Sequence, residues 1–343
     1  MYNTEKYVGA CLISLLNQTF QNFEVIIVDD CSTDNSCAVV ESFMPKFGGR
    51  LKLYRSKVNS GPAIPSNRGV NLSCGKYLFI MDSDDLIVNN ALETFYRYAE
   101  NASADVVHID VGYKFRRNSQ KPFPAQEDVE IVGWHGGPFV NKPTLESDDI
   151  AARMLKISRN GVGWTAWQKF VRRDFILENE IVFPKMRTSQ DIVWVVQVFS
   201  LAKKILTIPE PLYIHRNNPT SNTGRKRTKE EFIHYRMDNS AEGMKFLLNF
   251  FDKHKFFKEN PQCQWWVMNF WAGVHSMRDL VVDTPIYEVY QTVQDTFKQR
   301  FGECGNLIAY LCYSSALLQH NWRTAEQRIM QLENHLKELQ KPN

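Results

Sequence analysis

Strand-like and helix-like segments alternate between residues 8 and 110, and this alternation constrains the fold more than any other feature of the chain. Residues 24–28, Glu-Val-Ile-Ile-Val, form a short and nearly continuous apolar run of the kind found in buried parallel strands. We expect further strands at residues 51–54, 76–81 and 105–110, and helices at residues 8–16, 35–47, 62–72 and 91–99. Such a rhythm is typical of a mostly parallel sheet covered by helices. The sequence therefore predicts an α/β fold.

The pattern changes after residue 224, where the basic run Arg-Lys-Arg-Thr-Lys begins. Residues beyond this point follow helical spacing only, so we predict one domain over residues 1–224 and an α-helical region over residues 225–343. Within the first domain, residues 113–145 are rich in proline and glycine and predict a loop-rich insertion.

A seven-residue apolar repeat lies near the end of the chain, at Trp322, Ala325, Ile329, Leu332, Leu336 and Leu339. Such spacing is typical of a helix that buries one stripe. Two interpretations stay open: the helix packs on the body of the protein, or it forms a homodimer.

Composition excludes several classes of protein. The formal net charge of +3 is too small for a general nucleic-acid binder. The seven cysteines are scattered without paired spacing, which argues against a disulfide framework or a zinc site. The longest apolar run, residues 192–202, is shorter than the roughly 20 residues that cross a bilayer. Because residues 1–6 are polar and unlike a secretory signal, we expect a cytoplasmic protein, soluble or peripheral at the inner face of the membrane.

Acidic side chains follow two of the expected strands. Asp29 and Asp30 end the first, and Asp82, Asp84 and Asp85 follow another. Ligands of parallel sheets bind beyond the carboxyl ends of the strands, so both groups are expected at one edge. Carboxylates that converge repel one another unless a cation lies between them, and an all-oxygen site suits Mg²⁺ or Mn²⁺. Such an ion commonly stabilises a departing pyrophosphate, as a nucleotide-sugar contains. The alternative, that these aspartates only cap turns and helices, stays open.

Several motifs together resemble those of family 2 glycosyltransferases, the inverting enzymes with the GT-A fold. The order of the motifs is also similar, and the resemblance extends over residues 1–224. The segments that carry it are residues 2–7 (YNTEKY), 28–34 (VDDCSTD), 67–69 (NRG), 81–85 (MDSDD), 168–173 (QKFVRR), 189–191 (SQD) and 211–216 (PLYIHR). The resemblance implies a GT-A type, Rossmann-like sheet and a role in bacterial surface polysaccharide or glycolipid synthesis.

The resemblance also implies roles for five residues in binding a UDP-sugar donor. Tyr2 would stack on the base, and Asp30 would accept a hydrogen bond from a uracil imide. Asn67 lies in a donor-binding motif, although Ser66 stands where the family often carries an arginine. Asp84 would be the direct metal ligand, while Asp82 would contact the ribose or a metal-bound water.

Asp191 matches the position of the family's catalytic base, with Gln190 in place of the usual glutamate. An inverting displacement needs one carboxylate that takes the proton of the acceptor hydroxyl. Asp191 could also cap the helix that follows, and the two roles are compatible.

Other side chains could face the phosphates or the acceptor. Lys169, His215 and Arg216 are cations in or beside the motifs, although such residues are more often paired or solvated. Trp134, His135 and Trp164 could line a site for an acceptor saccharide, although core packing is the usual fate of tryptophan.

The acceptor could equally be a lipid-linked saccharide at the membrane. Aromatic residues at 245–251 are followed by Lys253, Lys255 and Lys258, a combination suited either to an anionic membrane surface or to an ordinary solvated helix face.

One departure from the family bears on fold and function. Family members begin with an apolar strand ending in Pro-x-Tyr-Asn, whereas this sequence starts at Met1-Tyr2-Asn3. We therefore expect the first central strand to be missing, with two open strand edges inside the fold. A shortened sequence and an inactive relative that serves as a binding or scaffold protein both stay open. A nucleotidyltransferase is a third interpretation, weakened by the absence of a Gly-rich, basic triphosphate loop near the start.

Overall fold

The computed structural model describes residues 1–116, 121–218, 221, 226–275, 298 and 328. The chain divides into two compact units. The first contains residues 1–225 and 245–267, and the second contains residues 226–244 and 268–343.

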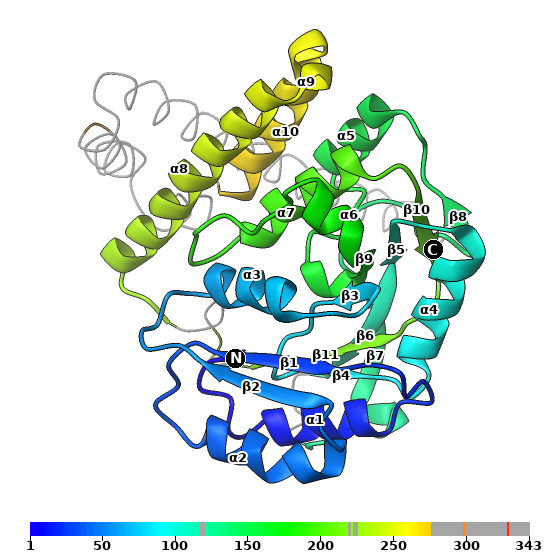
Figure 1. Ribbon diagram of the computed structural model, residues 1–343. Coiled ribbons are helices and arrows are strands. Elements are labelled where there is room, and N and C mark those ends of the chain that lie inside the picture. Colours follow the sequence, from blue (N-terminus) through cyan, green and yellow to red (C-terminus); the bar gives the residue numbers. More distant parts are fainter. Residues whose placement is uncertain (117–120, 219–220, 222–225, 276–297, 299–327, 329–343) are drawn as a thin grey trace, which may run out of the picture. The chain divides into compact units, whose positions relative to one another are not determined.

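Most elements of the first unit lie close to their expected positions (Figure 1). Its strands are β1 (Val25–Asp29), β2 (Leu51–Arg55), β3 (Tyr77–Phe79), β4 (Leu86–Ile87), β5 (Val106–Ile109), β6 (Val111–Phe115), β7 (Val129–Gly133), β8 (Thr144–Leu145), β9 (Lys169–Arg172), β10 (Ile205–Ile208) and β11 (Tyr213–His215). Its α-helices up to residue 225 are α1 (Val8–Leu16), α2 (Ser36–Phe43), α3 (Ala63–Leu72), α4 (Ala91–Ala102), α5 (Ile150–Ser158), α6 (Arg173–Glu178) and α7 (Gln190–Leu201). Short 3-10 turns are η1 (Met44–Phe47), η2 (Gln126–Asp128) and η3 (Ala166–Gln168).

The strands form three sheets in the described part of the chain, with orders β1-β2, β3-β9-β5-β10-β8 and β4-β11-β6-β7. The pairs β1–β2, β5–β10 and β6–β11 are parallel, and the other pairs are antiparallel. The expected α/β class is confirmed, with mixed rather than mostly parallel pairing. The mixture arises because β9 inserts antiparallel between β3 and β5, and because the segment expected to be a loop-rich insertion supplies β7 and β8.

The core explains why these segments become strands and helices. Every residue of β5 and β10 is buried, as expected for apolar runs covered on both faces. Residues 192–200 of α7 are likewise all buried, because this helix is apolar nearly all round. Around the β1–β2 pair, α1 and α2 lie on one side and α3 lies on the other (Figure 1).

The strands β1 and β3 are edge strands of their sheets. In the described residues, β1 pairs only with β2 and β3 pairs only with β9. Residues 25–27 and 77–79 stay half-buried although they are largely apolar, in contrast to β5 and β10. Met1 provides one step of pairing beside β1, since its nitrogen donates to Val28 O at 3.0 Å and its carbonyl accepts from Asp30 N at 2.9 Å.

Element boundaries differ from expectation where tertiary pairing intervenes. At the end of the segment expected to be a loop, Leu145 pairs with Leu206 in β8, and α5 begins at Ile150. The side chain of Asp149 caps α5 by accepting from Ala151 N at 2.9 Å. The strand expected at residues 76–81 is confined to β3, because the chain turns away toward the aspartates that follow.

The C-terminal region is helical where it is described, in α8 (Lys229–Lys253), α9 (Lys255–Glu259) and α10 (Pro261–Val274). In the second unit, Trp271 is fully buried and its indole donates to Ser240 O at 2.9 Å. Gly243 permits this packing, since an added Cβ would lie 2.1 Å from the indole. The apolar repeat at residues 322–339 falls outside the described residues. No helix within the described ranges is both long and apolar enough to cross a membrane.

Candidate active site

The carboxylates of Asp82, Asp84 and Asp191 come together at one edge of the sheet. Asp82 is exposed to solvent, yet protein atoms crowd its carboxylate. This desolvation, together with the charges of Asp84 and Asp191, raises the pKa of Asp82 to about 7. Since the charge of Asp191 acts on Asp82, the turn after β3 lies in the same region as the start of α7.

The acidic end of β1 lies near the same edge. Burial lowers the pKa of the Met1 amino group, and the carboxylates of Asp29, Asp82, Asp30 and Asp84 oppose that shift. The two acidic groups, which are about fifty residues apart in sequence, therefore both lie close to Met1.

The segment that begins with β11 supports the turn that carries Asp84. Asn218 Nδ2 donates to Asp84 Oδ2 at 2.8 Å. Asp85 is buried and accepts from the Tyr213 hydroxyl at 2.7 Å and from Arg216 N at 2.6 Å. Burial, with the nearby Asp84 and Asp82, raises the pKa of Asp85 well above its ordinary value. Asp85 therefore anchors the turn that carries Asp82 and Asp84.

Arg216 is a structural clamp in this conformation. Its guanidinium donates to Asp84 O at 3.0 Å, to Lys121 O at 2.9 Å and to Pro122 O at 2.8 Å. It also lies over the Phe115 ring, 4.3 Å from the centroid. These contacts tie the connection between β6 and β7 to the aspartate turn, and they direct the cation to backbone carbonyls.

Asp191 lies in the first turn of α7, whose N-cap residue is Ser189. Asp191 is therefore not the cap of this helix, which sequence reasoning had left open. Its Oδ2 accepts from Ala166 N at 3.1 Å. Burial raises the pKa of the Asp191 carboxyl, while the Ala166 N–H and the charge of Lys169 oppose the shift. A half-buried carboxylate with a raised pKa is suited to accepting a proton.

Asp30 and Asn67 are engaged by the protein itself. Asp30 is buried, with Oδ1 accepting from Ser60 N at 2.9 Å and Oδ2 accepting from Gly61 N at 2.8 Å. The Asn67 amide forms two hydrogen bonds with the backbone of Phe183, at 2.8 and 2.9 Å. Asp30 thus holds the Ser60–Gly61 segment, and Asn67 holds the backbone of Phe183. Tyr2 is 47% exposed at the chain start.

Aromatic rings form a stack close to the carboxylates. Trp167 stacks on Tyr213 with centroids 4.2 Å apart, and Trp134 meets Trp167 edge-on at 4.7 Å. His215 lies 5.9 Å from the Trp167 ring, and burial lowers its pKa. Sequence reasoning named Trp134 and His215 but missed Trp167, whose position next to the 168–173 motif was the available signal.

His135 and Trp164 differ in their surroundings. The buried His135 imidazole lies 2.9 Å from Asp110 Oδ1, and its Nδ1 accepts from Gly137 N at 3.1 Å. It is thus held inside the fold. Trp164 is half-buried in the loop that leads to η3.

A divalent ion would find carboxylate ligands at Asp82 and Asp84. No group of three or more His, Cys, Asp and Glu side chains in the described residues is arranged as a ready-made metal cage. The donor set is nevertheless all-oxygen, and burial, followed by the charges of Asp84 and Asp191, raises the pKa of Asp82. These features fit Mg²⁺ or Mn²⁺, which commonly take only one or two protein carboxylates and fill their remaining positions with phosphate and water.

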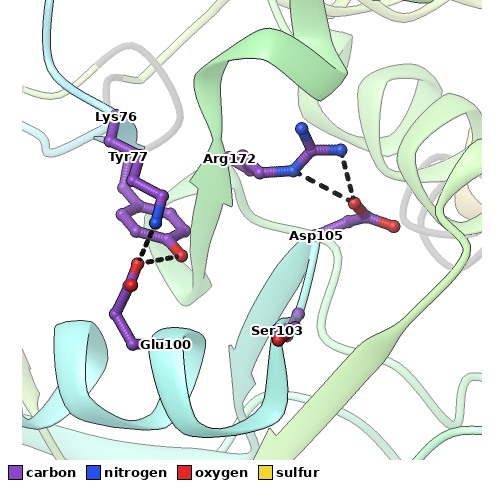
Figure 2. Close-up of a pocket in the computed structure, with 7 residues that line it drawn as sticks. Lys76, Tyr77, Glu100, Ser103, Asp105 and Arg172 are labelled. Carbon is purple, nitrogen blue, oxygen red and sulfur yellow. Dashed lines mark hydrogen bonds and ion pairs between the residues drawn. The ribbon is translucent and has the colours of Figure 1, made fainter.

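A hollow at the opposite end of the strands has different chemistry (Figure 2). It lies where β3 and β5 begin, and its charges are matched. Lys76 pairs with Glu100 at 2.5 Å, and Arg172 pairs with Asp105 at 2.8 Å. Since each cation already has its carboxylate, this hollow offers no charge for a phosphate or a metal ion.

Comparisons with known proteins point to one family. Residues 1–155 match the model described as glycosyl transferase family 2. The chain is 30% identical over 231 residues to glycosyltransferase GlyG of Streptococcus pneumoniae, covering 64% of this chain and 70% of that protein. It is 26% identical over 270 residues to the cholesterol galactosyltransferase of Borreliella burgdorferi, covering 73% of this chain and 71% of that protein.

The fold is shared with a solved structure. TarS 1–349 of S. aureus, crystallised in complex with UDP, superposes with a TM-score of 0.60 at 19% identity, covering 95% of this chain and 90% of that chain. At this identity the likeness concerns the fold alone, and it confirms the GT-A-like α/β architecture.

Proposed function

Because this chain belongs to glycosyl transferase family 2, we propose that it transfers a sugar from a UDP-sugar to an acceptor hydroxyl with inversion, in the synthesis of a surface polysaccharide or glycolipid. The observation that carries the proposal is the gathering of Asp82, Asp84 and Asp191 at one sheet edge. Two of these carboxylates can hold a cation, and the third can act as a base. The complex of TarS with UDP supports the choice of donor class.

Asp191 is the proposed catalytic base. Its carboxylate would take the proton of the acceptor hydroxyl as that oxygen attacks the anomeric carbon and the bond to the diphosphate breaks. The Ala166 N–H, 3.1 Å from Oδ2, keeps this side chain at the edge instead of letting it turn to solvent. Inversion follows if attack and departure occur on opposite faces of the sugar.

Asp84 and Asp82 are the proposed holders of Mn²⁺ or Mg²⁺. Such an ion, when bound, neutralises charge on the leaving diphosphate. Asn218 fixes the Asp84 carboxylate, and the buried Asp85 anchors the turn that would hold the ion. We assign Tyr2, Asp30 and Asn67 to the nucleoside end, with Tyr2 stacking on the base.

The acceptor is proposed to be a saccharide, free or lipid-linked. Half-buried Trp134, which contacts Trp167, has an aromatic ring of the kind that suits sugar rings. Leu248 and Trp265 are 49% and 65% exposed on the C-terminal helices of the first unit, and Lys253, Lys255 and Lys258 are in the same part of the chain. We propose that this part contacts the cytoplasmic face of the membrane peripherally.

We also propose two features of the chain's organisation. The first is a catalytic domain at residues 1–224 followed by a helical region at residues 225–343. The second is a homodimer formed through the C-terminal helix, which would show as a doubled mass in sedimentation and as a monomer after removal of residues 322–339.

The test is a screen of UDP-sugars against simple saccharide acceptors, with and without Mn²⁺. We expect metal-dependent UDP binding by calorimetry, metal-dependent release of UDP, and a product whose anomeric configuration by NMR is opposite to that of the donor. Retained configuration would refute inversion.

A non-catalytic scaffold is the second candidate, favoured by the open edges of β1 and β3. It predicts neither metal-dependent UDP binding nor donor hydrolysis. A nucleotidyltransferase would instead release pyrophosphate from a nucleoside triphosphate, which the same assay detects.

A further inference from the structure

We propose that Lys169 is a positioning residue for the catalytic base. Its ammonium group holds the loop of residues 163–166 in the conformation in which the Ala166 N–H orients the carboxylate of Asp191. This inference rests on the proposed role of Asp191 as the base. Lys169 is a buried cation that takes no part in the bond changes of the proposed reaction.

The surroundings of Lys169 are unusual for a lysine. The side chain is only 1% exposed, at the start of β9 in the middle of the sheet. Its Nζ donates to the carbonyl oxygens of Gly163 and, at 2.8 Å, of Thr165. In the described structure no carboxylate lies within ion-pair distance of this ammonium. A buried charge is costly unless it is well solvated by the protein, so the two carbonyls are its solvation.

Two electrostatic effects act on the Lys169 ammonium in opposite directions. Burial lowers the pKa of Lys169 to about 7, while the attraction of Asp191 and Asp110 opposes the shift. The charge of Lys169 in turn favours the ionised form of Asp191. His108, which faces the lysine from β5, has its pKa lowered well below its ordinary value by burial first and by Lys169 second, and thus adds no competing charge.

The loop between the lysine and the base is tightly fitted. A Cβ on Gly163 would lie 2.1 Å from Gln168 Oε1, so the chain passes directly over that side chain. The Thr165 hydroxyl donates to the same oxygen at 2.7 Å. The next residue, Ala166, donates its N–H to Asp191 Oδ2 at 3.1 Å. The carbonyl that Lys169 holds and the N–H that Asp191 accepts therefore belong to one peptide group, between Thr165 and Ala166.

That shared peptide group is the central point. Rotation of the peptide would break the bond to Lys169 and the bond to Asp191 together. A neutral side chain of similar length cannot donate to two carbonyls, so Lys169→Met would release the peptide and leave two acceptors without their donor. The carboxylate of Asp191 would then lose its fixed direction, and small displacements of a catalytic group cost about 100-fold in rate.

The experiment compares Lys169→Met with Lys156→Met in the full chain. Lys156 is the matched control because it is a partly buried lysine whose Nζ pairs with Glu146 at 2.7 Å, outside the proposed site. For each variant, kcat and KM are measured with the UDP-sugar that the wild type hydrolyses, along with UDP affinity in Mn²⁺ and the melting temperature. We expect Lys169→Met to lower kcat about 100-fold with UDP affinity within about twofold, and Lys156→Met to leave both unchanged.

A milder variant covers the case in which Lys169→Met does not fold. Thr165→Val keeps the shape of the side chain and removes only its bond to Gln168. We expect kcat to fall about tenfold and UDP affinity to stay the same, since the loop is loosened while the lysine remains.

The outcomes separate this inference from the proposed function. Unchanged kcat in Lys169→Met, or in Thr165→Val where the first variant is unfolded, while Asp191→Asn is inactive, would overturn the role of Lys169 alone. A lower melting temperature with unchanged kcat would reduce Lys169 to a purely structural residue and also overturn the inference. Full activity of Asp191→Asn would remove the base itself and hence the proposed mechanism.

Discussion

The two ends of the five-stranded sheet carry similar numbers of charged groups but treat them differently. At the end where β3 and β5 begin, Lys76 and Arg172 neutralise Glu100 and Asp105 (Figure 2). At the opposite edge, burial raises the pKa of Asp82 to about 7, and the charges of Asp84 and Asp191 add to the shift. Matched pairs stabilise a fold, whereas unmatched carboxylates cost stability and have to be explained by a ligand. This difference is the reason why we place the proposed chemistry at the end that carries Asp82.

The largest effect should come from Asp191→Asn. The amide keeps the size of the side chain but cannot take a proton, so we expect kcat to fall about 1,000-fold while UDP binding is retained. Steady-state kinetics with calorimetry for UDP measures both. A variant that keeps more than a tenth of the wild-type kcat would show that Asp191 is not the catalytic base.

Asp84→Ala should act on binding. Its carboxylate is held by Asn218 at 2.8 Å beside the exposed Asp82, where a cation would be shared. We expect metal-dependent UDP affinity to fall about 100-fold, the value typical for losing a good charged ligand contact. Titration of UDP in the presence and absence of Mn²⁺ gives the result. Equal UDP affinity for wild type and variant in Mn²⁺ would remove Asp84 from the metal site.

Asp105→Asn tests the paired end. Asp105 is 6% exposed; its Oδ1 accepts from Arg172, and its Oδ2 accepts from the backbone of Lys203 at 2.8 Å and Lys204 at 3.1 Å. The NH2 group of the asparagine side chain would point at one of these N–H donors and could not accept its hydrogen bond. We expect the free energy of unfolding to fall by about 2 kcal/mol with kcat unchanged. Denaturant melts and kinetics on the same sample decide, and a large loss of kcat would contradict the division between the two ends.

Much of this comparison was accessible from the sequence, because strand ends and carboxylates are local features. Asp82 and Asp84 followed from an apolar run that stops at acidic residues. The direction of β9 could not be predicted, since a short apolar segment pairs equally well either way. Its antiparallel insertion is what buries Lys169 near Asp191.

Other features depended on contacts between distant segments. Arg216 was a candidate for phosphate binding, but its guanidinium is committed to the carbonyls of Lys121 and Pro122. The carboxylate of Asp30, which we assign to the nucleoside end, also accepts hydrogen bonds from Ser60 and Gly61. Residue type and spacing reveal neither, because the partners come from loops that have no sequence signature.

The smallest expected effect is the change in stability with pH that Asp82 causes, and its sign distinguishes the two ends of the sheet. The folded-state pKa of Asp82, about 7, lies above the ordinary value of 3.8, so the folded protein without metal ion binds a proton at Asp82 more readily than the unfolded chain. The contribution of Asp82 to the free energy of unfolding should therefore fall as the pH rises from 4 to 7. A paired carboxylate has the opposite effect. Asp82→Asn removes the charge and should stabilise the metal-free protein at pH 8.

Because solvent screens the exposed Asp82, the gain should be limited to about 1 kcal/mol. The measurement is the free energy of unfolding of wild type and Asp82→Asn in chelator at pH 5 and pH 8. The two proteins should differ at pH 8 and converge at pH 5, where the wild-type carboxyl is already protonated. A variant less stable than wild type at pH 8 would mean that Asp82 is compensated as Asp105 is, and the contrast between the two ends of the sheet would disappear.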